Sequence, residues 1–228
     1  MKSEELGAKN PLRALGLKGG EEPVMGLVMA RAGLGKTAIL VQFALDCMLL
    51  GNKVLHVSIG ESVDKTRSWY DDILGRLTGG EKLDDIPGIM KNRMIMTFKE
   101  NVFSSARFEE RLEDFISQDV YRPDCLIIDG YEFTENSRSE LEELGKFMAE
   151  KNIGSAWFSA VSHRGDQRKS AAGVPAPCHE IDDMFANVLL IMPDADAITL
   201  DIIKCDSGSH QAGAKLWLDP ATMLVQKS

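Results

Sequence analysis

Residues 23–52 constrain the fold of this chain more than any other part of its sequence. They read PVMGLVMA, then RAGLG, then KTAILVQFALDCMLLGN. The first part is short and almost wholly apolar, as expected for a central strand of a parallel sheet. The last part has the composition of an apolar helix, and Gly51 followed by Asn52 is a common signal for a helix C-terminus. A strand, a tight glycine-rich turn and a helix in this order predict an α/β fold.

The turn between the strand and the helix carries a motif with a known physical role. Residues 30–37 read A-x-x-x-x-G-K-T, one methyl group away from the phosphate-binding template G-x-x-x-x-G-K-[ST]. Gly33 and Gly35 can take positive φ angles, so the backbone N–H groups of residues 32–37 can form a concave anion site. Lys36 would then reach the β- and γ-phosphates, and the Thr37 hydroxyl would ligate Mg²⁺.

Ala30 stands where the template has its first glycine. A methyl group is the mildest departure from glycine, and it is tolerated provided that the end of the strand does not require a positive φ. The alternative interpretation is a chance glycine-rich turn before a buried helix. The candidate nucleotide-binding residues are Ala30, Arg31, Ala32, Gly33, Leu34, Gly35, Lys36, Thr37 and Ala38.

The rest of the chain alternates between strand-like and helix-like segments. Strands are predicted at 53–61 and 93–98, in an apolar run that ends at Asp129, and at 154–162. Helices are predicted at 63–77, 104–118 and 137–152, and a loop at 78–88. Four further strands, at 187–192, 197–204, 214–219 and 223–227, follow with short turns between them, one of them at 193–194. This order predicts a mostly parallel, helix-flanked sheet with antiparallel strands at one edge.

Length and composition indicate how much structure the chain can bury. It has 228 residues, of which 44% are hydrophobic, enough for one α/β core. We expect a single domain over residues 1–228, with an extension at 1–20 and a core at 21–228. The most apolar run, residues 38–50, is interrupted by Gln42 and Asp46, which disfavours a membrane span. The N-terminus lacks the basic-then-apolar order of a signal peptide, so we expect a cytoplasmic protein.

Charge and cysteine content disfavour two kinds of site. The formal net charge of −9 argues against a surface that coats nucleic acid, although it leaves room for a local basic loop. The cysteines at 47, 125, 178 and 205 lie far apart and form no C-x-x-C pair. We therefore expect reduced, packed thiols rather than a metal or redox site.

Two acidic residues at strand ends are candidates for chemistry. Asp129 closes the strand CLIID at the carboxyl edge of the predicted sheet, where a carboxylate can hold Mg²⁺ through its water shell. Glu61 closes the strand VLHVSIGE across the nucleotide from Lys36, where it can orient a water for attack on the γ-phosphate. The alternatives are a capping or turn aspartate at 129 and a solvated turn glutamate at 61.

With these motifs, the sequence resembles the RecA-like ATPases, in the branch of the clock protein KaiC and the DnaB-type hexameric helicases. The resemblance covers nearly the whole chain from about Leu12, and it is carried by ARAGLGKT, VLHVSIGE, PDCLIIDG, AWFSAVSHR and IIKCDSGSHQAG. The first and third of these motifs are the specific ones. The resemblance implies a RecA-like three-layer α/β/α fold. It implies that this fold is a P-loop NTPase core that binds ATP with Mg²⁺. It also implies a homo-oligomer assembled head to tail, usually a six-membered ring, in which a neighbouring subunit completes each site.

The resemblance also implies roles for individual residues. Glu61 or the adjacent Gly60 position corresponds to the catalytic glutamate of the family. Lys204 corresponds to one member of a basic pair that reaches into the neighbouring subunit's site. The catalytic candidates are therefore Lys36, Glu61 and Lys204, and the metal candidates are Thr37 and Asp129.

Two positions depart from the family pattern. Val161 stands where the family often has a glutamine that senses the γ-phosphate, and Asp206 stands where an arginine of the basic pair is expected. A cation supplied by a neighbour is worth about 10³ to 10⁵ in rate in related phosphoryl-transfer enzymes, so its partial loss predicts slow turnover. His163 or Arg164 can compensate, or they can simply form a polar loop start.

Residues 164–178, RGDQRKSAAGVPAPC, correspond to the segment that lines the central pore in ring-forming relatives. Arg164, Arg168 and Lys169 make this segment basic, but it has no aromatic residue on which a base could stack. A flexible, solvated loop is therefore favoured over a nucleic-acid contact.

The first functional hypothesis from the sequence is a Mg-ATP-binding ATPase with slow hydrolysis. The second is a nucleotide-gated scaffold or regulator, with an unidentified protein partner, that binds ATP without useful turnover. The third is a recombinase- or helicase-like DNA motor, which depends on the basic loop and is disfavoured by the acidic net charge. Ring assembly would suit an enzyme and a scaffold alike.

Overall fold

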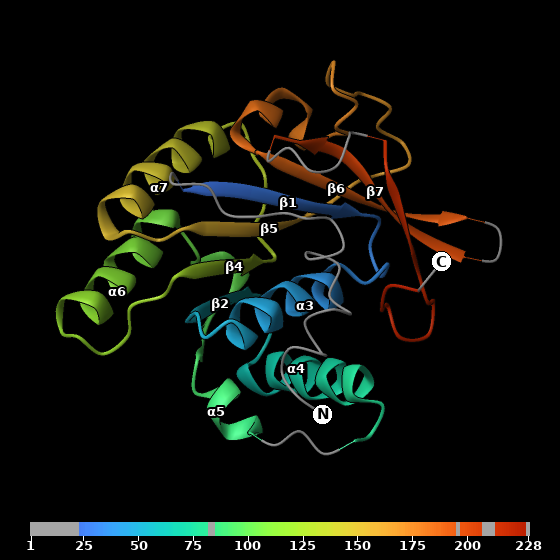
Figure 1. The fold of residues 1–228 in the computed structure, drawn as a ribbon. Coiled ribbons are helices and arrows are strands. Elements are labelled where there is room, and N and C mark those ends of the chain that lie inside the picture. Colours follow the sequence, from blue (N-terminus) through green and yellow to red (C-terminus); the bar gives the residue numbers. More distant parts are fainter. Residues whose placement is uncertain (1–22, 82–84, 195–196, 207–212, 227–228) are drawn as a thin grey trace.

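The computed structural model describes residues 23–81, 85–194, 197–206 and 213–226 (Figure 1). The extension expected at residues 1–20 lies outside this part of the chain. Strands of the described residues form one sheet in the order β3-β2-β4-β5-β1-β6-β7-β8. The strands are β1 (Val24–Ala30), β2 (Val54–Ile59), β3 (Arg93–Phe98), β4 (Cys125–Asp129), β5 (Ser155–Val161), β6 (Asn187–Asp194), β7 (Ala197–Cys205) and β8 (Lys215–Leu218).

The first six strands in chain order run parallel to one another, and the last two are added at one edge by antiparallel pairing. Strands β1 to β6 pair in parallel, whereas β7 pairs antiparallel with β6 and β8 antiparallel with β7. The prediction of a mostly parallel α/β sheet with antiparallel strands at one edge is therefore confirmed. Because the parallel strands share a direction, their carboxyl ends meet at one edge of the sheet.

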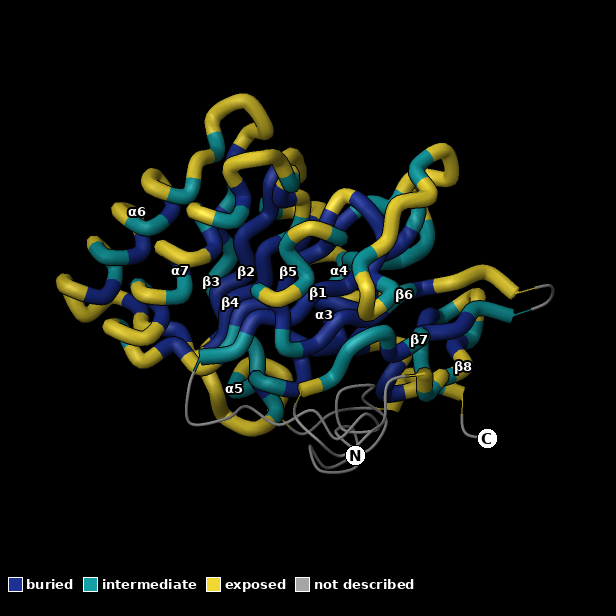
Figure 2. The backbone as a smooth tube through the Cα atoms, turned by 90° about the horizontal axis from the view of Figure 1, so that it is seen from above, coloured by how far each residue is buried: buried dark blue, intermediate teal, exposed yellow. Residues whose placement is uncertain are grey.

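Helices cover both faces of this sheet. The helices α3 (Lys36–Leu49), α4 (Val63–Thr78) and α5 (Ile86–Met90) lie on one face, and α6 (Ser105–Ser117) and α7 (Ser137–Lys151) lie on the other (Figure 1). Three short 3₁₀ segments complete the described elements, at η1 (Glu100–Val102), η2 (Cys178–Glu180) and η3 (Asp182–Met184). The strands at the centre of the sheet are buried between the two helical layers, as the dark blue centre of Figure 2 shows.

The packing of a neighbouring tryptophan explains why a glycine occurs in the middle of the sheet. Gly26 of β1 pairs in register with Trp157 of β5. A Cβ atom at position 26 would lie 2.4 Å from the indole ring of Trp157, so only glycine leaves room for this side chain. The indole in turn packs edge-on against Phe43 of α3, with ring centroids 4.6 Å apart. These contacts fix α3 against β1 and β5.

Three predicted boundaries were wrong. Residues 78–88 were expected to be a loop, but α5 begins at Ile86 because Asp85 caps it by accepting a hydrogen bond from the N–H of Gly88. The turn expected at 193–194 is instead part of β6, which continues as a ribbon with β7 beyond its last pairing with β1 at Leu190. The strand expected at 223–227 is reduced, within the described residues, to one bridge between Leu218 and Val225.

A fully buried histidine makes the stability of this fold depend on pH. The Nδ1 atom of His56 lies 2.9 Å from the hydroxyl of Tyr70, and its Nε2 has no hydrogen-bond partner among the described residues. Burial lowers the pKa of His56 to about 4; Asp129 opposes this shift and the Arg93 guanidinium adds to it.

We expect this histidine to stabilise the fold less as the pH falls. The unfolded chain has a histidine pKa of about 6.5, so between about pH 6.5 and pH 4 it binds a proton that the folded chain excludes. The free energy of unfolding should therefore fall by about 3 kcal/mol over this range. Urea unfolding at several pH values tests this, with His56→Gln expected to flatten the pH slope and exposed His163→Gln expected to leave it unchanged. An unchanged slope in His56→Gln would contradict it.

Candidate functional site

The loop between β1 and α3 has the backbone that the motif requires. Gly33 and Gly35 have φ angles of 77° and 83°, which confirms the positive φ values expected for them. Ala30 is the last residue of β1 and is not among the residues with positive φ, so its methyl group is accommodated without strain. Gly35 is the N-cap of α3 and supplies no side-chain cap. The first N–H groups of this helix are therefore left to an outside acceptor.

The structure brings Thr37 and Asp129 into direct contact. The Thr37 hydroxyl donates a hydrogen bond of 2.6 Å to Oδ2 of Asp129. Asp129 ends β4, which is separated from β1 by β5 in the sheet. The hydroxyl of Ser159, on β5, donates a hydrogen bond of 2.6 Å to Oδ1 of the same carboxylate. Each oxygen of Asp129 thus accepts one hydroxyl group.

Ser159 is a site residue that the sequence did not reveal. Its side chain is buried, and its oxygen also accepts a hydrogen bond of 3.0 Å from the N–H of Gly130. A serine inside an apolar strand carries no motif, and the pairing of β4 with β5 that brings it to Asp129 joins segments far apart in the sequence. Ser159 is a positioning residue, because it holds the carboxylate that faces Thr37.

The Lys36 ammonium group lies near the Asp129 carboxylate, in partly buried surroundings. Burial lowers the pKa of Lys36, and the nearby charge of Asp129 partly offsets this shift. An anion placed before the uncapped start of α3 would restore a favourable partner for the ammonium. The site therefore combines backbone donors at the start of α3, the Lys36 cation and the Asp129 carboxylate at the carboxyl edge of the sheet.

The oxygen donors at this site have the chemistry that Mg²⁺ prefers. Mg²⁺ binds hard oxygen ligands, and in nucleotide sites it takes one or two from the protein and the rest from phosphate and water. The Thr37 hydroxyl and the Asp129 carboxylate are such donors, in contact with one another. Within the described ranges no group of three or more His, Cys, Asp or Glu side chains gathers as a metal cluster. The residues present therefore fit a metal held jointly with a phosphate ligand.

Glu61 does not end a strand, contrary to the sequence prediction. Strand β2 ends at Ile59, and Glu61 lies two residues further on, immediately before the N-cap Ser62 of α4. Its carboxylate is about half exposed and forms an ion pair with Lys65, one turn along the helix. Its role as a catalytic base remains a prediction, and it requires release from Lys65.

A second carboxylate lies beside the end of β2. Gly60 has a φ of 88°, and a Cβ atom at this position would lie 2.7 Å from Oε1 of Glu100. Glu100 begins the 3₁₀ segment after β3 and so reaches the same edge of the sheet from a neighbouring strand. The sequence prediction did not include Glu100, because its proximity to Gly60 depends on the pairing of β2 with β3.

The side chain of Lys204 contacts two residues of its own chain. Its ammonium group lies 3.3 Å from Oδ2 of Asp206 and donates a hydrogen bond of 3.2 Å to the carbonyl oxygen of Asp182. The replacement of an expected arginine by Asp206 thus also provides a partner for the remaining lysine. Val161 ends β5 directly beside Ala30 of β1, so a side chain at this position borders the loop that follows Ala30.

The basic segment at 164–178 makes more contacts with itself and with the core than the sequence suggested. Lys169 and Pro175 form an isolated antiparallel bridge, and Val174 and Cys178 are fully buried. Residues 174–176 and Cys178 thus pack into the core, and the expectation of a solvated loop is wrong for this end of the segment. Arg168 forms an ion pair with Asp166, with a shortest distance of 2.6 Å, which neutralises part of the positive charge.

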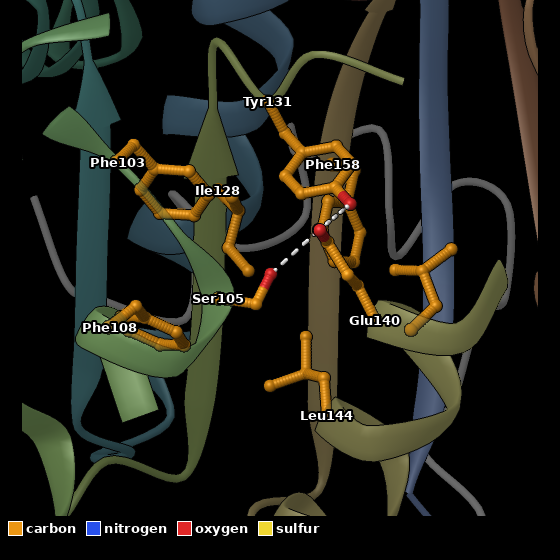
Figure 3. Close-up of a pocket in the computed structure, with 9 residues that line it drawn as sticks. Phe103, Ser105, Phe108, Ile128, Tyr131, Glu140, Leu144 and Phe158 are labelled. Atoms are coloured by element: carbon orange, nitrogen blue, oxygen red, sulfur yellow. Dashed lines mark hydrogen bonds between the residues drawn. The ribbon is translucent and has the colours of Figure 1, made fainter. Parts of the chain in front are cut away.

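A small apolar pocket lies on the opposite face of the sheet from α3 (Figure 3). Ile128 and Phe158 line it, and each is one residue before a site residue, Asp129 or Ser159, so their side chains point to the opposite face. The polar groups of the pocket are satisfied internally, since Glu140 accepts hydrogen bonds from Tyr131 at 2.6 Å and from Ser105 at 2.9 Å. The pocket therefore serves as the packed back wall of the candidate site.

Removing the Ser159 hydroxyl should weaken the affinity of the candidate site for Mg²⁺. In Ser159→Ala, Oδ1 of Asp129 and the N–H of Gly130 both lose a partner. Loss of such an outer contact typically costs at least about tenfold in metal affinity, so the Mg²⁺ concentration for half-maximal ATP binding should rise about tenfold. Ser159→Thr keeps the hydroxyl and should restore the wild-type value. A wild-type Mg²⁺ titration of Ser159→Ala would show that Ser159 does not position Asp129.

Comparisons with known proteins add no assignment to this geometry. No protein-family model matches the chain, and no curated protein matches it. Among the described residues, no helix has both the length and the apolar character needed to cross a membrane.

Proposed function

We propose that this chain is a Mg-ATP-binding ATPase of the RecA-like, KaiC and DnaB-type branch, with slow hydrolysis at sites formed between subunits of a homo-oligomer. The observation that carries the proposal is the 2.6 Å contact of Thr37 with Asp129, two residues 92 positions apart. They meet beside a helix start that has no side-chain cap and that follows two glycines with positive φ. A chance glycine-rich turn would not account for a distant carboxylate at this place.

Each residue of the site has a role in binding a nucleotide. The N–H groups of Gly33 and of residues 35–37 would donate to the β-phosphate, and Lys36 would contact the β- and γ-phosphate oxygens. The Thr37 hydroxyl can offer a lone pair to the metal while it continues to donate its hydrogen bond to Asp129. When bound, Mg²⁺ would neutralise charge on the phosphates. Ser159 keeps Asp129 oriented throughout.

The contacts around the catalytic candidates support slow turnover. Glu61 is paired with Lys65, and Lys204 is held by Asp206 and a backbone carbonyl. Both must leave these partners before they can act on a water or on a neighbouring subunit's nucleotide. In the free chain Glu61 and Lys204 are thus held by other partners, whereas the groups that would bind phosphate are already in position.

Steady-state phosphate release from Mg-ATP over a range of protein concentrations tests this proposal. We expect slow release that rises per subunit with concentration, because each site is completed by a neighbour, and that falls strongly in Glu61→Gln. The matched control is Glu132→Gln, an exposed carboxylate shortly after β4. Rapid release that is independent of concentration would contradict a site shared between subunits.

The second candidate function is an ATP-binding regulatory scaffold without significant turnover. The ion pairs of Glu61 and Lys204 favour it as well, since both groups are occupied within the chain. ATP binding without measurable phosphate release at any protein concentration would select this function. A DNA motor is less favoured, because Arg168 of the basic segment is already paired with Asp166.

A further inference from the structure

The contact of Thr37 with Asp129 determines which way a bound nucleotide must point. Asp129 and Ser159 belong to β4 and β5, on one side of β1, whereas β6, β7 and β8 lie on the other side. A metal shared by Thr37 and Asp129 would place the γ-phosphate toward β4. The nucleoside is attached at the other end of the triphosphate. It would therefore leave the loop on the side of β6 to β8.

A turn of the C-terminal region is fixed at this side of the loop (Figure 1). Asp219 organises the turn, because its Oδ1 accepts hydrogen bonds of 2.8 and 2.9 Å from the N–H groups of Ala221 and Thr222. The helices α3 and α4, which lie on the same face of the sheet, both donate hydrogen bonds to this turn. Gln42 of α3 donates to the carbonyl oxygen of Met223 at 2.9 Å, and Arg76 of α4 donates to that of Thr222 at 3.3 Å.

Met223 connects this turn to the candidate phosphate loop. A Cβ atom at Gly35 would lie 2.5 Å from the Cε atom of Met223, so the thioether side chain lies directly on the N-cap of α3. Met223 has a φ of 59°, a conformation that costs a residue with a side chain about 1 kcal/mol or more. The residue as a whole is 9% exposed, and it packs with the same core cluster as Leu34 of the loop.

We propose that Met223, together with Leu34, forms an apolar wall against which the base of the bound nucleotide packs. The inference rests on the proposed function, and it names the part of the site that contacts the nucleoside. A thioether is polarizable and makes favourable contacts with the face or edge of aromatic rings. The ligand class is a nucleoside triphosphate whose flat aromatic ring covers Met223. Inorganic tripolyphosphate shares the phosphates of this ligand but lacks the ring.

Calorimetric titration with Mg-ATP and with Mg-tripolyphosphate separates the wall from the phosphate loop. The variants are Met223→Gly, which keeps the positive φ without strain and removes the side chain, and Met223→Leu, which keeps the apolar volume. We expect Met223→Gly to weaken Mg-ATP binding about tenfold, the equivalent of one moderate apolar contact. Tripolyphosphate binding should change by less than about twofold, and Met223→Leu should bind Mg-ATP like the wild type.

The other outcomes overturn the inference in distinguishable ways. Equal losses of both ligands in Met223→Gly would mean that Met223 only supports the loop, and no loss of either would mean that the nucleoside lies elsewhere. If the wild type bound tripolyphosphate as tightly as ATP, the wall would be excluded while the phosphate site remained. This comparison needs no variant, so it holds even if Met223→Gly fails to fold. If the wild type bound neither ligand, the proposed function itself would fail.

Discussion

Lys36→Ala is expected to lower the affinity of this chain for Mg-ATP by about 100-fold. The ammonium group of Lys36 is partly buried beside the start of α3, where burial already lowers its pKa and only Asp129 offsets the shift. A charge-assisted contact of this kind is worth about 1.5 to 3 kcal/mol, and more when several phosphate oxygens are contacted at once. Isothermal titration calorimetry of both proteins with Mg-ATP measures the effect.

A matched control separates this loss from a general change in charge. Lys146→Ala removes an exposed lysine from α7, on the opposite face of the sheet, and should leave the affinity unchanged. Lys36→Arg should recover only part of the affinity, because a guanidinium group is larger and planar where a compact ammonium group is expected. Affinity for Mg-ATP in Lys36→Ala equal to that of the wild type would place the nucleotide away from this loop.

Gly130→Ala is expected to lower the free energy of unfolding by about 3 kcal/mol or more. Gly130 has a φ of 91°, which a residue with a Cβ atom rarely adopts, and the added Cβ would lie 2.4 Å from the carbonyl oxygen of Ile59. The neighbour is backbone at the end of β2, so it cannot rotate away as a side chain would. Strain and overpacking therefore add, and each alone typically costs about 1 to 3 kcal/mol.

Urea unfolding of Gly130→Ala and of Gly165→Ala measures the difference. A Cβ atom added at Gly165 would meet no other atom within 4 Å, so this substitution should change the free energy of unfolding by less than about 0.5 kcal/mol. The two variants add the same methyl group, and they differ in backbone angle and available space. Equal stability of the two would show that the ends of β2 and β4 are not as close as described.

Much of the fold could be predicted from local sequence patterns. The bounds of β3 agree with the prediction residue for residue, because an apolar run between polar turns specifies a buried strand locally. The helix α6 begins where Ser104 caps it, as the serine in the sequence indicated. The extent of β6 could not be predicted, because Pro193 is a turn signal in isolation. In the sheet it lies beyond the last pairing with β1, in a ribbon that tolerates proline.

The candidate site could be predicted where a motif carries it and not where tertiary pairing creates it. Thr37 and Asp129 were expected in one site, and the structure brings them into contact. Ser159 and Met223 carry no local signal, because their roles depend on the order of strands in the sheet and on the docking of a distant turn. Glu61 was expected at a strand end because Gly60 was counted within the strand, whereas its positive φ ends β2 earlier.

The central claim is that the loop between β1 and α3 holds the triphosphate and that Thr37 and Asp129 hold its metal. A crystal structure of the chain grown with Mg²⁺ and a non-hydrolysable ATP analogue tests this claim most directly. We expect the β-phosphate on the backbone N–H groups of Gly33 and residues 35–37 and the metal on the Thr37 hydroxyl, with Asp129 still accepting the hydrogen bond of that hydroxyl. A nucleotide bound elsewhere, or a metal that contacts neither Thr37 nor the water shell of Asp129, would contradict the account.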